Sequence, residues 1–394
     1  MTLNEPIAVA SAPVAAQPGA VIDPGPDFSR EVYCILGLPF DLVDVQQACA
    51  RMHLASKERR RCFLSTPNLN FVIACLQDLQ FRETVLQSNL SVIDGMPIVW
   101  IARALGLPFT ERVSGSTLFD ALRSTAGRNG VDPMRIYFFG GLPGVAKLAC
   151  EKINADRSGM QAVGYETPGF GTVEEMSSPE TIAAINQSGA DFLVVALAAR
   201  KGQQWVQRNR DALQVPLMGH LGAVINFVAG TVSRAPVWVQ KTGLEWAWRI
   251  KEEPALWRRY WNDGRTLLKL LWSVVIPAAR AARRPAPAAA QFDAAGMELK
   301  LDHGTSELLL SGAIGQPNIG RWRSLLAQAA QGQGPVVLDC AQLTWIDSAA
   351  VGSLILLYAA CMAAKRPWAI INPSASLRRQ FELMCAQYLL EPLR

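Results

Sequence analysis

Short runs of aliphatic and β-branched residues alternate with longer segments of helical periodicity between residues 31 and 279. Such runs predict buried strands, and the segments between them predict covering helices. We therefore expect an α/β fold with a mainly parallel sheet and helices on both faces, in which ligands bind at the carboxyl ends of the strands. The expected strands are Val32–Leu36, Cys62–Ser65, Leu90–Ile93, Ile136–Phe139, Gln161–Gly164, Phe192–Ala196 and Val215–Met218. The expected helices are 44–57, 69–78, 97–106, 117–126, 144–155, 179–188, 203–213 and several stretches after 235.

The pattern stops at residues 280–292, an Ala-, Pro- and Arg-rich segment typical of a linker. It then starts again and predicts a small α/β domain over residues 293–394. The first domain is expected over 29–279, after an Ala/Pro/Gly-rich segment at 1–28 that predicts a disordered tail without a secretory signal. In the second domain we expect a hairpin of Met297–Leu301 with Glu307–Ser311, strands at Pro335–Leu338 and Trp368–Ile371, and helices at Ile319–Gln331, Val351–Ala364 and Leu377–Gln387.

Charge is concentrated in one part of the chain. The net charge is +5, and residues 234–284 hold eleven Lys or Arg against four Asp or Glu. Within this part, Arg234–Tyr260 carries four tryptophans. This composition favours a membrane-facing appendage that meets an anionic, partly apolar partner, although a solvated helical face remains the alternative. The apolar stretch Leu267–Ala279 is too short to span a bilayer, so it predicts either a helix on the membrane surface or a buried one.

The eight cysteines and three histidines are scattered and form no metal-binding pattern. The cysteines therefore predict buried thiols in a reducing compartment. No Asp-x-Asp pair is present either, so the sequence predicts neither a metal nor a cofactor, and we expect no nucleic-acid partner.

Three expected strands end in residues that could carry chemistry. Thr66 and Asn68 follow the strand that ends at Ser65, where they could cap a helix or bind a ligand. Asp94 and Gly95 follow the next strand, where Asp94 could be a helix cap or a general base. Gly140 and Gly141 begin a glycine-rich turn that would let backbone N–H groups approach a phosphate. Each signal is weak alone, but together with the later arginines they fit a sugar-nucleotide transferase.

Seven motifs follow one another along the chain: STPN at 65–68, DG at 94–95, RVSG at 112–115, FFGGLPGVA at 138–146, RAPVWV at 234–239, GLEWAWR at 243–249 and EPALWRRY at 253–260. In this order they resemble the WecG/TagA/CpsF family of bacterial glycosyltransferases (glycosyltransferase family 26). The resemblance covers residues of about 31 to 272 and implies a Rossmann-like sheet with a helical C-terminal appendage.

The resemblance implies transfer of a sugar from a UDP-sugar, of the N-acetylmannosamine or related uronic acid type, to a polyprenyl-diphosphate-linked sugar. It implies inversion at the anomeric carbon without a metal ion. Asp94 matches the family's proposed base, and Thr66, Asn68 and Arg112 match its substrate-binding positions. The appendage arginines, which would hold the diphosphate and help membrane docking, fall among Arg234, Arg249, Arg258 and Arg259.

Two positions depart from the family pattern. Gly202 stands where the family has a Gln that is thought to contact the substrate, and Gln203 follows it as a candidate replacement. Asn226 replaces an Asp. Loss of one substrate hydrogen bond would cost about 1–3 kcal/mol, so activity and donor identity are left open by these changes.

The C-terminal domain resembles a STAS domain, the fold of anti-sigma-factor antagonists, through residues 336–357. That family's regulatory phosphoserine falls on Ala349, so Ser348 is the remaining candidate for phosphorylation. The alternative, which we favour, is that Ser348 is a helix N-cap. This domain is then expected to dock a protein partner rather than to act as a phosphorylation switch.

The main hypothesis is an inverting glycosyltransferase of exopolysaccharide or cell-surface glycan synthesis, bound to the inner face of the cell membrane. Self-association is left open. The rival hypothesis is a catalytically degenerate transferase that serves as a binding scaffold through its STAS domain. A nucleotide-binding dehydrogenase is a third reading, against which the absence of a GxGxxG motif counts.

Overall fold

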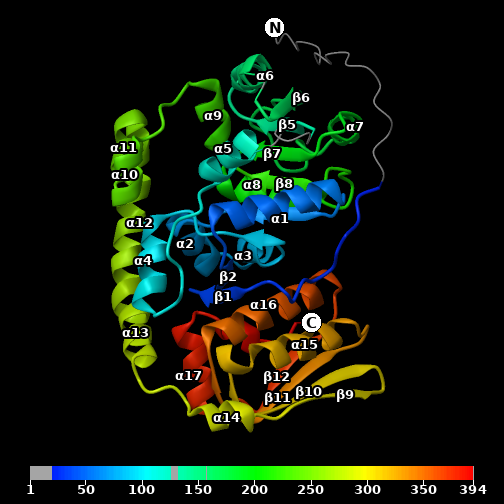
Figure 1. The fold of residues 1–394 in the computed structure, drawn as a ribbon, viewed down its shortest axis with the longest axis vertical. Helices are drawn as coiled ribbons and strands as arrows, with labels where there is room; N and C mark the ends of the chain where they lie inside the picture. Colours follow the sequence, from blue (N-terminus) through cyan, green and yellow to red (C-terminus); the bar gives the residue numbers. More distant parts are fainter. Residues whose placement is uncertain (1–19, 126–131, 157, 394) are drawn as a thin grey trace. The chain divides into compact units, whose positions relative to one another are not determined.

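The computed structural model describes residues 20–125, 132–156 and 158–393. The chain forms two compact units, and each is built from separate stretches of sequence. The first contains Val43–Thr66, Val113–Leu256 and the residues up to Asp23. The second contains Pro24–Leu42, Pro67–Arg112 and Trp257–Arg394. The second unit therefore holds both the C-terminal domain and several segments from the N-terminal third of the chain (Figure 1).

The fold is α/β, with a parallel sheet whose strand order is β4-β3-β8-β7-β5-β6. Five of these strands lie in the first unit, and helices cover both of its faces. The strands are β3 (Cys62–Ser65), β4 (Leu90–Ser91), β5 (Met134–Gly140), β6 (Met160–Glu166), β7 (Phe192–Ala196) and β8 (Leu217–His220). The helices of the first unit are α1 (Val45–Lys57), α5 (Gly115–Thr125), α6 (Val145–Asp156), α7 (Pro179–Gln187), α8 (Ala199–Asn209), α9 (Val224–Ala229), α10 (Val237–Thr242) and α11 (Glu245–Glu252).

Adjacent residues of β5 show how the sheet is covered, because successive side chains of a strand point to opposite faces. Phe139 stacks on Trp205 of α8, with ring centroids 4.1 Å apart. Phe138 meets Phe119 of α5 at 6.3 Å. All four rings are buried, so the continuous apolar runs that predicted these strands reflect a sheet enclosed on both sides.

The first predicted strand does not belong to the parallel sheet. β1 (Val32–Ile35) pairs antiparallel with β2 (Leu38–Asp41), and the two form a separate hairpin in the second unit. The turn between them holds Leu36 and Gly37, both at positive φ. The hairpin therefore corrects the expectation that Val32–Leu36 belongs to the parallel sheet.

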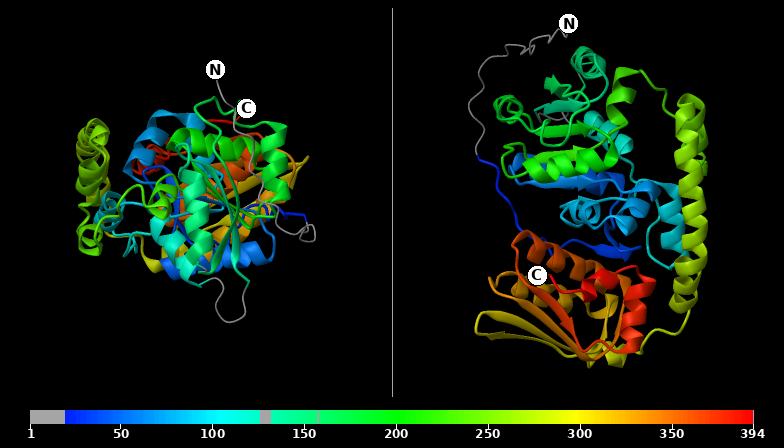
Figure 2. Two further views of the ribbon diagram at one scale, coloured as in Figure 1. Left: turned by 90° about the horizontal axis from the view of Figure 1, so that it is seen from above. Right: turned by 180° about the vertical axis from the view of Figure 1, so that it is seen from behind.

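The second unit also contains three helices from the N-terminal third and a long helical rod. The rod consists of α12 and α13 with a π-helical turn at Leu271–Val275 between them, and it runs beside α2 (Figures 1 and 2). The three helices from the N-terminal third are α2 (Leu69–Gln77), α3 (Leu79–Leu86) and α4 (Met96–Ala104), and those of the rod are α12 (Trp257–Leu270) and α13 (Ile276–Ala282). Among the described residues, no helix combines the length and apolar character needed to cross a bilayer.

The C-terminal domain follows the expected order of elements, and β9, β10 and β11 are longer than the pattern indicated. Its sheet has the order β12-β11-β10-β9, in which β9 and β10 are antiparallel and the other pairs are parallel. A short helix, α14 (Ala289–Asp293), forms within the predicted linker, and its Phe292 is buried against Trp345. The elements are β9 (Met297–Asp302), β10 (Thr305–Ile314), α15 (Ile319–Ala330), β11 (Val336–Ile346), α16 (Ser348–Ala363), β12 (Trp368–Ile371) and α17 (Ala375–Leu383).

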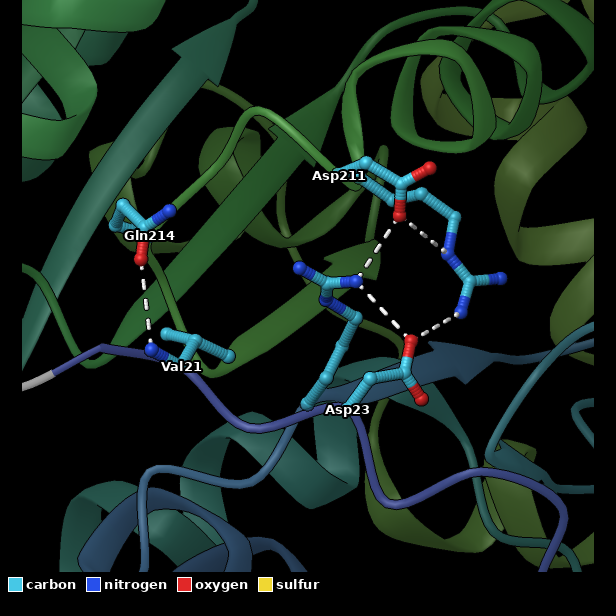
Figure 3. A network of polar contacts seen from close by, with 6 residues as sticks. Val21, Asp23, Asp211 and Gln214 are labelled. Atoms are coloured by element: carbon cyan, nitrogen blue, oxygen red, sulfur yellow. Dashed lines mark hydrogen bonds and ion pairs between the residues drawn. The ribbon is translucent and has the colours of Figure 1, made fainter.

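Part of the expected tail has defined contacts, and its first nineteen residues lie outside the described residues. Asp23 accepts from Arg61 at 3.1 Å, and Arg61 also binds Asp211 at 3.0 Å. Figure 3 shows this network together with the bond from the Val21 amide to Gln214. Disorder was therefore predicted too far along the chain.

The cysteines were predicted to be buried thiols, and all eight are buried and free.

Candidate functional site

The candidate base lies at the end of β4, in a loop that is tied to the start of α2. Asp94 is half-buried, and its N–H donates to the carbonyl oxygen of Pro67 at 3.1 Å. A Cβ atom on Gly95, whose φ is +154°, would lie 3.6 Å from Cβ of Asn68. The structure thus brings Asp94, Gly95 and Asn68 together within the second unit.

Asn68 and Asp94 were each also candidates for a helix cap, and only Asn68 has that role. Asn68 is the N-cap of α2, since its Oδ1 accepts from the Phe71 amide at 3.1 Å. Asp94 is not the N-cap of α4, because the cap residue is Gly95. A carboxylate at a strand end, outside the capping position, keeps the general-base interpretation in place.

A buried carboxylate joins the appendage to α2 two residues beyond Asn68. The side-chain amide of Asn70 donates to Oδ1 of Asp263 on α12 at 3.0 Å. Burial raises the pKa of Asp263, while the Asn70 bond and the nearby Arg259 act in the opposite direction. Arg258 and Arg259 belong to the same helix and are exposed. This bond therefore fixes α12, with its two predicted diphosphate arginines, to the helix that Asn68 caps. Arg112, also in the second unit, is half-buried.

The glycine-rich turn after β5 is shaped by its neighbouring strand. A Cβ atom on Gly140 would lie 2.5 Å from the carbonyl oxygen of Ala196, and the Gly141 amide donates to that same oxygen at 2.9 Å. Both glycines have positive φ. The Gly141 amide is thus engaged by β7, and the exposed residues 142–144 at the start of α6 are the part of this turn that remains open to an anion.

Other predicted ligand contacts of the first unit are engaged within the protein. Thr66 is buried. Gln203 is fully buried, and its Nε2 donates to Oγ of Ser65 at 3.0 Å, so contact with a substrate would require this pair to separate. Arg234 pairs with Asp120 and donates to Thr117 at 2.8 Å. Arg249 lies 3.6 Å from Glu253 and faces the ring of Phe227.

The comparisons with known proteins cover most of this chain. Residues 33–283 match the Glycosyl transferase WecG/TagA/CpsF family. The chain belongs to this family. Residues 297–391 match the family described as Mlab, STAS domain, so the C-terminal domain is a STAS domain. As a member of the WecG/TagA/CpsF family, the chain is a glycosyltransferase by descent.

Two relatives carry the same name, N-acetylglucosaminyldiphosphoundecaprenol N-acetyl-beta-D-mannosaminyltransferase. The one from Bacillus spizizenii is 25% identical over 222 residues, which make up 56% of this chain and 83% of that protein. The one from Bacillus subtilis is 25% identical over 210 residues, which make up 53% of this chain and 78% of that protein.

The departure from the family pattern at Gly202 has a physical cause in this glycosyltransferase. A Cβ atom on Gly202 would lie 2.2 Å from Cδ2 of His220, so the imidazole occupies the space that any side chain would need. His220 is buried, and its Nε2 is 2.8 Å from the carbonyl oxygen of Leu197. The His220 ring thus occupies the space that a side chain on residue 202 would need, a contact that a glycine in a polar run could not reveal in the sequence.

Two more features were missed or misassigned from the sequence. The pairing of Asn70 with Asp263 was missed, although Asn70 in the otherwise apolar start of α2 was a signal for it. Ser348 is not the N-cap of α16, since Asp347 fills that role and accepts from the Ala350 amide at 2.8 Å. Within the described ranges, no group of three or more His, Cys, Asp or Glu side chains could hold a metal ion.

Proposed function

We propose that this glycosyltransferase moves a sugar of the N-acetylmannosamine or uronic acid type from a UDP-sugar to a polyprenyl-diphosphate-linked acceptor, with inversion and without a metal ion. Family membership over residues 33–283 carries the proposal. The two Bacillus relatives, whose names specify an undecaprenol-diphosphate acceptor and a mannosaminyl group, support the choice of substrates. The product would enter exopolysaccharide or cell-surface glycan synthesis.

Asp94 is the proposed general base. Deprotonation of the acceptor hydroxyl, as it attacks the anomeric carbon, requires a carboxylate that is accessible and held by a rigid backbone. The half-buried side chain and the hydrogen bond from the Asp94 amide to Pro67 support this assignment. Asn68 and Thr66 would orient the sugars, and Gly95 supplies the φ of +154° that the loop beside Asn68 adopts.

Each unit offers groups that suit the UDP diphosphate. Arg258 and Arg259 are exposed on α12, and Arg112 is half-buried. Guanidinium groups bind phosphate oxygens in pairs and balance the charge that develops on the leaving group. In the first unit, the exposed start of α6 offers backbone N–H groups to an anion. Arg234 and Arg249 of that unit would bind an anion only after leaving their carboxylate partners, Asp120 and Glu253.

Peripheral attachment to the inner face of the cell membrane is the proposed location. Trp257, Trp261, Leu268 and Trp272 recur at helical spacing along the rod and are exposed, with Trp272 at 73%. Arg258, Arg265 and Lys269 interleave with them. An apolar stripe flanked by cations suits the interface of an anionic bilayer, where the acceptor lipid also resides.

The experiment that tests the function is a donor screen with purified full-length protein. UDP-sugars would be incubated with a short-chain polyprenyl-diphosphate N-acetylglucosamine, and products would be identified by mass spectrometry. We expect transfer from one UDP-N-acetylhexosamine or UDP-uronic acid, both with and without a metal chelator in the assay. If no donor is turned over while another protein co-purifies through the STAS domain, the scaffold hypothesis replaces the enzyme.

A further inference from the structure

The β1–β2 hairpin of the transferase region lies against the start of α16 in the STAS domain, within the second unit (Figure 1). The hydroxyl of Ser348 donates to the carbonyl oxygen of Cys34 at 2.9 Å. The hydroxyl of Tyr388 donates to the carbonyl oxygen of Gly37, also at 2.9 Å. Both acceptors belong to the hairpin, at β1 and at its turn. The STAS domain therefore holds the hairpin by two hydroxyl groups that reach its main chain.

Two glycines let the main chains approach closely at this junction. A Cβ atom on Gly352 of α16 would lie 2.7 Å from the carbonyl oxygen of Val32. A Cβ atom on Gly37, whose φ is +80°, would lie 2.4 Å from the carbonyl oxygen of Cys385. Only glycine fits at either position without movement of backbone. The hairpin and the STAS domain are therefore fitted to each other on both sides of the contact.

A buried ion pair connects the same hairpin to β4. Asp41, the last residue of β2, binds Nε and Nη2 of Arg30 at 3.0 and 2.7 Å, and both residues are buried. Oδ2 of Asp41 also accepts from the Ser91 amide at 2.7 Å, and Nη1 of Arg30 donates to the carbonyl oxygen of Ser88 at 2.9 Å. The Arg30–Asp41 pair thus binds the main chain at Ser91, the last residue of β4, and at Ser88, two residues before β4 begins. Buried charges of this kind hold their geometry strictly, because a displaced partner leaves a charge unsatisfied.

Only two residues separate Ser91, which the ion pair binds, from the candidate base Asp94. Val92 and Ile93 are buried, and Asp94 follows them with its amide bound to Pro67. Three residues of chain span at most about 10 Å, so Asp94 lies within that distance of Ser91. A second route reaches the same place, because the guanidinium of Arg82 on α3 lies 3.9 Å from the ring centroid of Tyr388. α3 ends at Leu86, just before Ser88.

We propose that the STAS domain acts within its own chain as a positioning element for Asp94, through the hairpin and the Arg30–Asp41 pair. This inference rests on the proposed function, in which Asp94 is the base. Ser348 and Tyr388 are positioning residues, because they touch the hairpin and not the reacting groups. The hairpin covers this face of α16, so a separate protein would have to bind another face of the domain or displace the hairpin.

Loosening this contact is expected to affect turnover more than donor binding. A base that moves by about 1 Å can lower the rate of the chemical step as much as 100-fold, whereas the groups that hold the UDP moiety stay in place. The expected sign is therefore a lower kcat with a nearly unchanged KM for the donor. The local motion should also appear as faster amide hydrogen exchange in residues 88–95.

The test uses the full-length protein with a Ser348→Ala/Tyr388→Phe double variant. Thr344→Val is the matched control, since the Thr344 hydroxyl donates to the carbonyl oxygen of Gly312 at 2.9 Å inside the STAS domain, away from the hairpin. In the double variant we expect kcat to fall about 10-fold, the donor KM to change by less than about 2-fold, and exchange in residues 88–95 to rise about 10-fold. Ser348→Thr, which keeps a hydroxyl, should retain wild-type values.

Three results would overturn the proposal. One is a double variant with unchanged exchange in residues 88–95, another is a donor KM that rises while kcat stays constant, and the third is a Thr344→Val control that matches the double variant. Hydrogen exchange does not need turnover. A wild-type protein that transfers no sugar would therefore reject the proposed function, while the exchange data would still decide whether the STAS domain holds the Asp94 segment.

Discussion

The imidazole of His220 occupies the space in which a side chain on residue 202 would lie. The distance from Cδ2 of His220 to a Cβ atom built on Gly202 is 2.2 Å, well inside van der Waals contact. His220 cannot swing away freely, because it is buried and its Nε2 is bonded to Leu197. Glycine at 202 and histidine at 220 therefore depend on each other.

This dependence predicts a coupled pair of substitutions. Gly202→Gln, which restores the family residue, should lower the free energy of unfolding by about 1–3 kcal/mol because of overpacking. Adding His220→Ala should recover part of that loss, so the double-mutant cycle should give a non-zero coupling. Urea unfolding measures all four proteins. Strictly additive effects would mean that the ring and residue 202 do not compete for space.

His220 also predicts a pH dependence of stability. Its burial lowers the pKa of the ring below the ordinary value of 6.5. Between 6.5 and the lowered value the unfolded chain takes up a proton that the folded protein does not, so stability is lost as the pH falls through this range. His220→Gln should lose less stability than wild type between about pH 7.5 and about pH 5. Equal losses in the two proteins, measured by urea unfolding, would assign the pH dependence to other groups.

The catalytic proposal predicts the effect of replacing the candidate base. Asp94→Asn keeps the size of the side chain but removes its basicity, so sugar transfer should fall by about 100- to 10,000-fold. Binding of UDP, measured by calorimetry, should stay close to wild type because the diphosphate is held by other groups. Asp302→Asn, on the exposed strand β9, is the control and should change neither quantity. Near wild-type transfer by Asp94→Asn would remove Asp94 from its role.

The exposed stripe of the rod predicts lipid binding. A Trp261→Ser/Trp272→Ser variant should sediment less with vesicles that contain anionic lipid, by about 10-fold in partition coefficient. The residual binding should weaken further with added salt, because the interleaved cations act over a screened distance. Phe170→Ser is a fair control, since Phe170 is 88% exposed on a loop of the first unit. Equal loss in the control would point to nonspecific adsorption of aromatic side chains.

The sequence predicted the parallel sheet well, because strands buried on both faces are continuous apolar runs. It failed at the hairpin for the same reason. VYCI at Val32–Ile35 is as apolar as a sheet strand, while its partner LPFD at Leu38–Asp41 contains a proline that argues against a strand. β1 is buried in part by α16 of the STAS domain, some three hundred residues away along the chain, and no local pattern can show such a partner.

The candidate site was predictable in its residue types and less so in their partners. Strand-end placement was enough to propose Asp94, Asn68 and the glycine turn as candidates. The sequence could not show that Gln203 is bonded to buried Ser65, nor that the Gly141 amide is taken by Ala196. Such pairings depend on which strands are neighbours in the sheet, and that order is set by long-range packing.

Because every cysteine is buried, the folded protein should react only slowly with thiol reagents. Burial raises the pKa of several of these thiols, that of Cys34 to about 12, so the reactive thiolate is scarce as well as shielded. A single cysteine introduced on the exposed face of α12 would then be the one site that a maleimide dye labels quickly. A fluorophore at that position could report, in the otherwise native chain, when the rod meets a bilayer.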